Sequence, residues 1–291
     1  MAMEKLTLFN SQAILDNPQE EDYFEARYWN LKSLQDLVLQ RLDVLEKDPS
    51  ALPFCCVADI PESTIYEHLQ EPSLTSRQLF YNQSIKELIV RLTPKYHSMF
   101  YHSLKNEIRD KLIALGVHKY DITLYGVTTT EGHSASCEGD LSLKPLPECS
   151  GVAGCATLMI ECVYSQKLSS LHPAVKWWLT EMDVNVVILI NVNIMQQSIF
   201  LEVWKCVAID PGVPGLAADH GNWQNRPATE PWAVSSTTIS DGNRGFKASD
   251  CLSLQFSDVM IRQPSVPDQE ITLTEKELAW WAWFIFHDMY S

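Results

Sequence analysis

The chain of 291 residues lacks several features that would assign it to a specialised class of protein. Its eight cysteines include no C-x-x-C pair, and no spacing of cysteine and histidine matches a structural zinc site. No apolar run reaches the roughly 18 to 20 residues that span a bilayer, and residues 1–10 lack the apolar core of a secretory signal. These absences favour a soluble protein of the reducing cytoplasm, with ordinary buried thiols and no membrane partner.

Basic residues are also scarce, because 22 Lys and Arg stand against 37 Asp and Glu and give a formal net charge of −15. Such a field repels nucleic acid, which is therefore a disfavoured partner. Residues 74–115 are the exception, since seven basic side chains there face three acidic ones. They form either a binding face or a solvated helix surface. The basic set is Arg77, Lys86, Arg91, Lys95, Lys105, Arg109 and Lys111.

Residues 1–118 form a helical N-terminal part in this interpretation. Apolar residues recur at three- and four-residue steps over 24–47, which predicts an amphipathic helix. Two further helices are expected over 75–92 and 98–115, separated by the break at Thr93 and Pro94. Residues 51–60, with Pro53 and two adjacent cysteines, are interpreted as a connector.

Residues 119–206 form the predicted sheet core. Strands are expected around 120–127, 139–143, 156–164, 184–190 and 199–205, with a covering helix over 171–182. Residues 207–250 are interpreted as a loop or lid, because residues 208–250 hold five of the eleven glycines and show no periodicity. A strand at 252–256 and a capped helix starting at Thr274, with Glu277 completing the capping box, fill residues 251–291.

The predicted fold is therefore a single α/β domain with a mixed central sheet flanked by helices. The aromatic face of the last helix could be a core plug, a dimer surface or the wall of an apolar pocket. A homodimer stays open for the same reason.

Two acidic residues are the first functional candidates. Glu161 interrupts an otherwise apolar strand, where an ionised carboxylate is costly unless it is paired, hydrogen-bonded, bound to a metal or protonated. Asp140 follows Gly139 at the start of a neighbouring strand. A structural interpretation is that Asp140 caps a turn while Glu161 pairs with a cation such as Lys144 or Lys176.

The stretch 139–205 resembles the PD-(D/E)XK, or restriction-endonuclease-like, superfamily, and more narrowly a group of fungal hypothetical proteins with that core. Asp140 matches the motif aspartate and Glu161 the second acidic position. The resemblance implies a divalent-metal site and a water-activating lysine. Gly139 stands where the motif has proline, however, and Val163 stands where it has the catalytic lysine. Lys176 on the following helix is the candidate for a migrated lysine, although its helical phase differs from the apolar face.

Three functions follow. The first is a small-molecule enzyme on a degenerate nuclease-like fold, such as a metal-independent cyclase or cycloaddition enzyme of secondary metabolism that works by holding reacting ends together. It would use Glu161, Asp140 and Lys176, need no cofactor, and bind its substrate through a set of loop and helix side chains. The second is a magnesium-dependent nuclease, and the third a non-catalytic interaction protein. The expected substrate-binding side chains are Trp223, Trp232, His220, Arg226, Arg244 and Trp281.

Overall fold

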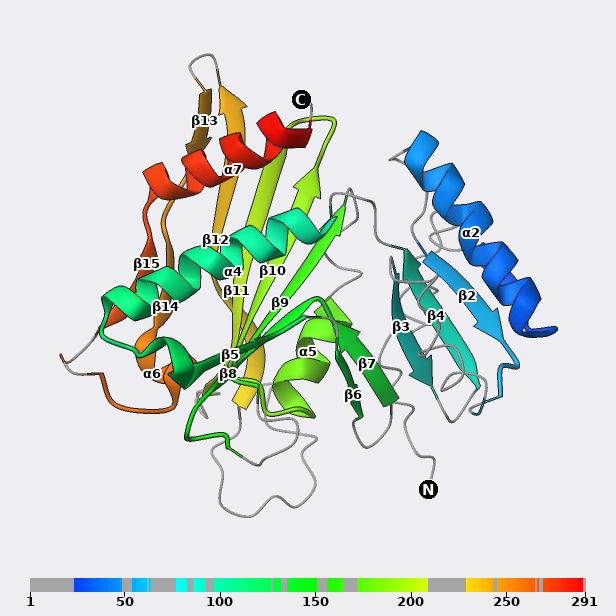
Figure 1. The fold of residues 1–291 in the computed structure, drawn as a ribbon, viewed down its shortest axis with the longest axis horizontal. Helices are drawn as coiled ribbons and strands as arrows, with labels where there is room; N and C mark the ends of the chain where they lie inside the picture. The colour runs from blue at the N-terminus through cyan, green and yellow to red at the C-terminus, as the bar shows by residue number, and fades with distance from the viewer. Residues whose placement is uncertain are drawn as a thin grey trace, which may run out of the picture.

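The computed structural model describes residues 24–48, 54–61, 63, 77–82, 86–92, 97–126, 128–131, 135–150, 156–164, 172–208, 229–242, 245–264, 266 and 269–289. These residues form two large β-sheets, a short two-stranded sheet and the helices that cover them (Figure 1). The short sheet pairs β14 (Leu252–Gln255) with β15 (Glu270–Leu273).

The larger sheet has the strand order β13-β12-β11-β10-β9-β8-β5. It is mixed, because β9 and β10 run parallel while the other neighbours run antiparallel. Its strands are β5 (Ile122–Tyr125), β8 (Leu141–Pro145), β9 (Leu158–Tyr164), β10 (Val186–Asn193), β11 (Ser198–Ala208), β12 (Thr229–Gly242) and β13 (Gly245–Ala248).

Both faces of this sheet are covered, which explains the continuous apolar sequence of β10. Ile188 and Ile190 pack in one core with α4 (His97–Ala114) and α7 (Glu275–Met289). Val187 and Leu189, on the opposite face, pack in a second core with α5 (His172–Thr180). The short helix α6 (Phe256–Met260) adds its buried residues to the first core, and the short helix η2 (Lys119–Asp121), which has no buried residue, precedes β5.

The second sheet has the order β1-β2-β4-β3-β7-β6 and lies beside the α5 face of the larger one (Figure 1). Leu88 and Val90 of β4 pack with α2 (Leu31–Lys47), whereas Ile89 joins the core that contains α5. Successive residues of β4 therefore face different layers. The strands are β1 (Phe24–Arg27), β2 (Phe54–Ala58), β3 (Arg77–Asn82), β4 (Glu87–Leu92), β6 (Thr128–Glu131) and β7 (Ala135–Gly139).

The predicted fold class is confirmed in its architecture: the chain is mixed α/β, with a mixed central sheet flanked by helices. The strands expected in the sheet core appear as β5, β8, β9, β10 and β11, and the helix over 98–115 as α4. The capping box is present, because Thr274 N donates to Glu277 Oε2 at 2.8 Å and Glu277 N to Thr274 Oγ1 at 3.3 Å. The assignment of one domain stays a prediction.

The helical interpretation of residues 75–92 is wrong. Residues 77–82 and 87–92 form the antiparallel pair β3–β4, and residues 54–58 of the expected connector form β2. The cause is burial on both faces of β4. A strand without a polar face lacks the alternation of apolar and polar residues that identifies a strand, so its sequence is a short apolar run that could equally be part of a helix. Strand β1 likewise precedes α2 in the segment interpreted as one helix.

The predicted loop or lid over 207–250 is wrong for its second half. Residues 229–242 form β12, which is antiparallel to β11. The register begins where Thr229 faces Ala208 and ends where Ser240 faces Ser198, and β13 continues the sheet. Long-range pairing overrides the composition of this segment, which is rich in Ser and Thr rather than in apolar residues. The rest of the predicted lid lies outside the described residues.

Five described cysteines, Cys55, Cys56, Cys162, Cys206 and Cys251, are free thiols. Cys149 is disulfide-bonded, so the interpretation of ordinary thiols does not hold for it. In the described part of the chain, no helix combines the length and apolar character needed to cross a bilayer.

One residue carries the chain from the second sheet into the larger one. Strand β7 ends at Gly139 and β8 begins at Leu141, so Asp140 alone forms the bend. A Cβ at position 139 would lie 2.5 Å from Met159 Sδ and 3.1 Å from Trp178 Cζ2. This close approach explains why glycine precedes Asp140.

We therefore expect Gly139→Ala to lower the free energy of unfolding by about 1–3 kcal/mol, because the added methyl group overpacks a buried site. Urea denaturation measures the loss, and Met159→Ala in the same chain should recover part of it. Gly126→Ala is the matched control, since a Cβ there meets no atom within 4 Å. Equal effects at positions 139 and 126 would contradict the steric explanation.

Candidate functional site

The guanidinium of Arg91 lies between the two carboxylates that the sequence singles out. Its Nη2 donates to Asp140 Oδ2 at 2.8 Å, and its Nη1 donates to Glu161 Oε2 at 3.3 Å. All three side chains are at most 3% exposed. We call Arg91, Asp140 and Glu161 the Arg91 cluster. It is an internal ion-pair network that joins the two large sheets.

Each member of the Arg91 cluster reaches it through strand alternation. Glu161 lies between Ile160 and Cys162, which belong to the core with α4, so its side chain extends to the α5 face of β9. Arg91 has the same parity in β4 as Ile89, which packs in the core with α5. Asp140 stands at the bend where the two sheets meet.

The carboxylates have further hydrogen-bond donors. Asp140 Oδ2 accepts the backbone N–H of Cys162 at 2.7 Å, and Glu161 Oε1 accepts the indole N–H of Trp178 at 2.8 Å. His97 Nε2 lies 3.5 Å from Asp140 Oδ2 and 2.7 Å from the carbonyl oxygen of Cys162. A carbonyl oxygen only accepts, so Nε2 carries the proton in this contact.

Burial dominates the electrostatics of the cluster. It raises the pKa of Glu161 from 4.5 to about 8, despite the opposing effect of Arg91. It also lowers the pKa of His97, although Asp140 acts in the other direction. Glu161 is thus mostly protonated and His97 neutral near pH 7. The charges of Arg91 and Asp140 then balance, which avoids a net buried charge.

The same arrangement tests the metal site that the superfamily resemblance implies. A divalent ion would need carboxylate oxygens that already accept hydrogen bonds from Arg91, Cys162 and Trp178. It would also lie beside a buried guanidinium of like charge. The residues present therefore do not fit Mg²⁺. Among the described residues, no group of three or more His, Cys, Asp or Glu side chains is placed to hold a metal ion.

The structure does not bring Lys176 into the site. Its side chain is exposed on α5, and none of the described contacts joins it to Asp140 or Glu161. Val163, at the position of the motif lysine, is 2% exposed and packs in the core with α5. The pairing of Glu161 with a cation is thus realised, and the cation is Arg91 rather than Lys144 or Lys176.

The two predicted substrate-binding residues that the structure describes, Trp232 and Trp281, do not lie beside Glu161. Trp281 is a core residue of α7 whose indole N–H donates to Ser103 Oγ at 2.7 Å, so it packs against α4 on the face of the sheet opposite Glu161. Trp232 is 58% exposed on β12, which is three strands away from β9. His220, Trp223, Arg226 and Arg244 lie outside the described residues.

Sequence reasoning missed Arg91, His97 and Trp178 as members of the site. The signal for Arg91 was available, because it interrupts the apolar run of residues 88–92 in the same way that Glu161 interrupts its strand. Its position in the basic segment 74–115 instead suggests a surface residue. A charged residue inside each of two apolar strands is a better indication of an internal pair than of a surface.

The raised pKa of Glu161 predicts how stability depends on pH. Between pH 4.5 and about 8, the folded chain holds a proton on Glu161 that the unfolded chain releases. The stability that this group contributes is therefore complete below pH 4.5 and is lost as the pH rises through 8. We expect the free energy of unfolding of wild type, relative to Glu161→Gln, to fall over this range and level off above it. Urea denaturation at several pH values tests this, and a difference independent of pH would contradict it.

Loss of the guanidinium should be severe. Arg91→Met leaves the buried Asp140 without its closest cation, so we expect a loss of roughly 3–5 kcal/mol in the free energy of unfolding. Arg109→Met is the matched control, because Arg109 on α4 forms an exposed ion pair, with its Nη2 3.1 Å from Asp110 Oδ1. This substitution should change the free energy of unfolding by less than about 1 kcal/mol. Similar losses in the two variants would show that the Arg91 cluster does not hold the sheets together.

Comparison with solved structures finds a distant structural likeness. The chain is similar to the crystal structure of a candidate nuclease belonging to DUF820 from Anabaena variabilis ATCC 29413, with a TM-score of 0.40 and 13% sequence identity. The match covers 75% of this chain and 98% of the other. No family model matches the chain, and no curated protein matches it.

Proposed function

We propose that this chain is a nuclease-like protein that does not cleave nucleic acid and acts by binding. The observation that carries this proposal is the guanidinium of Arg91, which lies within 2.8 Å of Asp140 and 3.3 Å of Glu161. A pair of carboxylates in a nuclease needs a bound cation to act on a phosphodiester. Here the chain supplies that cation from its own second sheet.

Within the described ranges, the candidates for a base near Asp140 and Glu161 are not placed to activate water, which supports the same proposal. Water activation needs a group that can take up a proton next to the reacting atoms. Val163 cannot do so, and Lys176 projects from the exposed side of α5. His97 is neutral, but it is 4% exposed and its Nε2 is bonded to the carbonyl of Cys162.

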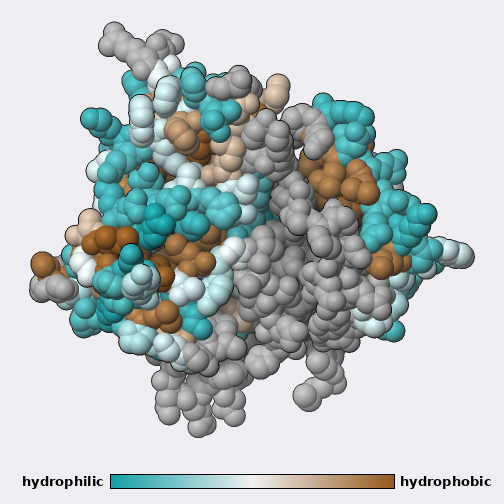
Figure 2. All heavy atoms as spheres, viewed as in Figure 1, coloured by the Kyte–Doolittle hydropathy of each residue, from teal (hydrophilic) through white to brown (hydrophobic). Residues whose placement is uncertain are grey.

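The surface charge is consistent with this conclusion. Arg91, one of the seven basic residues of segment 74–115, is buried in the Arg91 cluster. On α4, Arg109 pairs with Asp110, and Lys111 pairs with Glu277 at 2.6 Å. The outward side of α4 is hydrophilic in Figure 2. Two of the three Lys and Arg side chains of α4 have these acidic partners, whereas Lys105 Nζ lies 3.4 Å from His102 Nδ1. A net charge of −15 adds to the repulsion of a polyanion.

A small-molecule enzyme, such as a metal-independent cyclase of secondary metabolism, is the second candidate. The observation that favours it is the raised pKa of Glu161, which gives a carboxylic acid able to donate a proton near neutral pH. Its substrate would have to reach a side chain that is 1% exposed, so the two sheets would have to separate around Arg91.

A cytoplasmic location, a homodimer and independence from cofactors are further proposals that came from the sequence.

The test is isothermal titration of the full chain with Mg²⁺ and with Mn²⁺, for wild type and for Glu161→Gln. We expect no saturable binding at millimolar ion in either protein, and no ion-stimulated cleavage of DNA or RNA. Lys176→Ala is the control for a migrated lysine and should match wild type. Ion binding to wild type that Glu161→Gln abolishes, together with cleavage that Lys176→Ala abolishes, would overturn the proposal and restore the metal-dependent nuclease.

A further inference from the structure

The second sheet has an edge that is open on one side. Strand β1 pairs in parallel with β2, and within the described ranges no strand pairs with its other side. The backbone N–H of Tyr28 donates to Ala58 O at 2.9 Å, so by alternation the N–H and C=O groups of Glu25 and Arg27 point away from β2. An edge of this kind is a template for one more strand.

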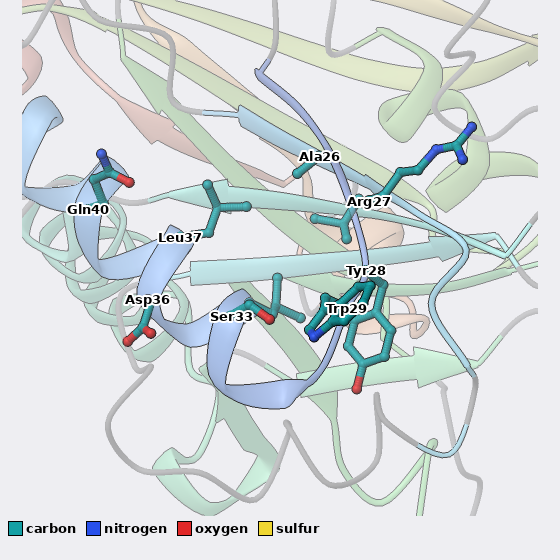
Figure 3. A pocket seen from close by; sticks show the side chains of 10 residues that line it. Ala26, Arg27, Tyr28, Trp29, Ser33, Asp36, Leu37 and Gln40 are labelled. Atoms are coloured by element: carbon teal, nitrogen blue, oxygen red, sulfur yellow. The ribbon is translucent and has the colours of Figure 1, made fainter.

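A groove runs between this edge and helix α2. It encloses about 360 Å³ and is lined by residues 26–29 on the strand side and by Ser33, Leu37 and other residues of α2 on the helix side, with Val57 of β2 also contributing. Figure 3 shows Leu37 projecting from the helix toward the sheet, and Tyr28 and Trp29 beside Ser33 at the first turn of α2. Trp29 is 85% exposed. The groove thus has an apolar wall, an aromatic end and backbone groups along one side.

An edge strand next to a helix is the geometry in which folded domains accept an extended peptide. Main-chain hydrogen bonds to the edge provide affinity, and side chains of alternate peptide residues enter the space under the helix and provide specificity. Here the apolar wall formed by Leu37, Tyr28 and Val57 suits one apolar side chain. The peptide residues two positions before and after it would face the same side.

The charges beside the groove favour a basic peptide. Asp36 lines it from α2, whereas the guanidinium of Arg27 extends away from α2 in Figure 3 and lies 4.0 Å from the carboxylate of Asp59. The net charge of −15 steers cations toward the chain. The exposed ring of Trp29 is a further contact for a Lys or Arg side chain.

We propose that an extended, basic segment of a partner protein adds to β1 as an outer strand and places an apolar side chain between β1 and α2. The site is separate from the Arg91 cluster, and β1 is two strands away from β4. The inference goes beyond the proposed loss of nuclease activity. It is measured by peptide binding rather than by metal binding or cleavage, so either proposal can fail without the other.

The probe is a fluorescein-labelled peptide with the sequence Thr-Lys-Thr-Val-Thr-Lys-Thr, titrated with the full chain and followed by fluorescence anisotropy. Its lysines and its valine lie on one face of an extended strand. We expect saturable binding that weakens several-fold when both lysines are replaced by glutamate. Asp36→Asn should weaken binding of the lysine peptide but not of a peptide with Ser in place of Lys.

Two backbone tests separate strand addition from nonspecific attraction. Arg27→Pro removes an outward N–H without touching the bond from Tyr28 to Ala58, so we expect at least tenfold weaker binding, whereas Arg27→Ala keeps that N–H and should stay within threefold of wild type. The second test needs no change in the protein. Of two peptides N-methylated on alternate residues in opposite phases, one should lose binding and the other should keep it.

Three results would overturn the proposal. They are no saturable binding of the lysine peptide at millimolar chain, equal binding of the two methylated peptides, and Arg27→Pro binding like Arg27→Ala when circular dichroism shows both variants folded. A further result would assign the edge to a second copy of this chain instead of a partner protein. That result is a dimer in sedimentation analysis that Arg27→Pro abolishes and Arg27→Ala preserves.

Discussion

The structure depends on one buried guanidinium held between two buried carboxylates. Breaking such a network is costly because it leaves a charge in a medium that cannot solvate it, although the intact network need not be more stable than an apolar core. What the network does is fix a geometry. Arg91 comes from one sheet, Glu161 from the other and Asp140 from the bend between them, so the three side chains meet only when the sheets are correctly placed. The protonation of Glu161 completes the arrangement by keeping its net charge near zero.

This interaction also explains why no lysine is needed next to the two acidic side chains. Two neighbouring acidic side chains cannot both be ionised without a nearby positive charge; here the guanidinium of Arg91 balances Asp140, and Glu161 holds a proton. Once Arg91 occupies the space between them, a lysine at position 163 would add a second buried cation to a site already balanced. An apolar residue such as Val163 is then the better choice, because it packs with α5.

The sequence predicts the parts of the fold whose pattern is local. Helices α4 and α7 and strands β8 to β11 follow from periodicity and capping, whereas β4 and β12 depend on partners far away in the chain. The site shows the same division. Asp140 and Glu161 are recognisable as misplaced charges, but their partner is 49 and 70 residues away, and nothing local connects them. The short sequence distance between Glu161 and Lys176 suggests a contact, but Lys176 is exposed on α5 and none of the described contacts joins the two.

The single-residue passage from β7 to β8 limits how this chain can vary in length. Most connections between strands lie on the surface and accept insertions, because extra residues extend into solvent. At Asp140 an added residue would turn every side chain of one strand to the opposite face. Leu141 and Leu143 would leave the core with α4, and the carboxylate would move away from the guanidinium. Among homologous chains, this junction should therefore be constant in length even where the surrounding loops differ.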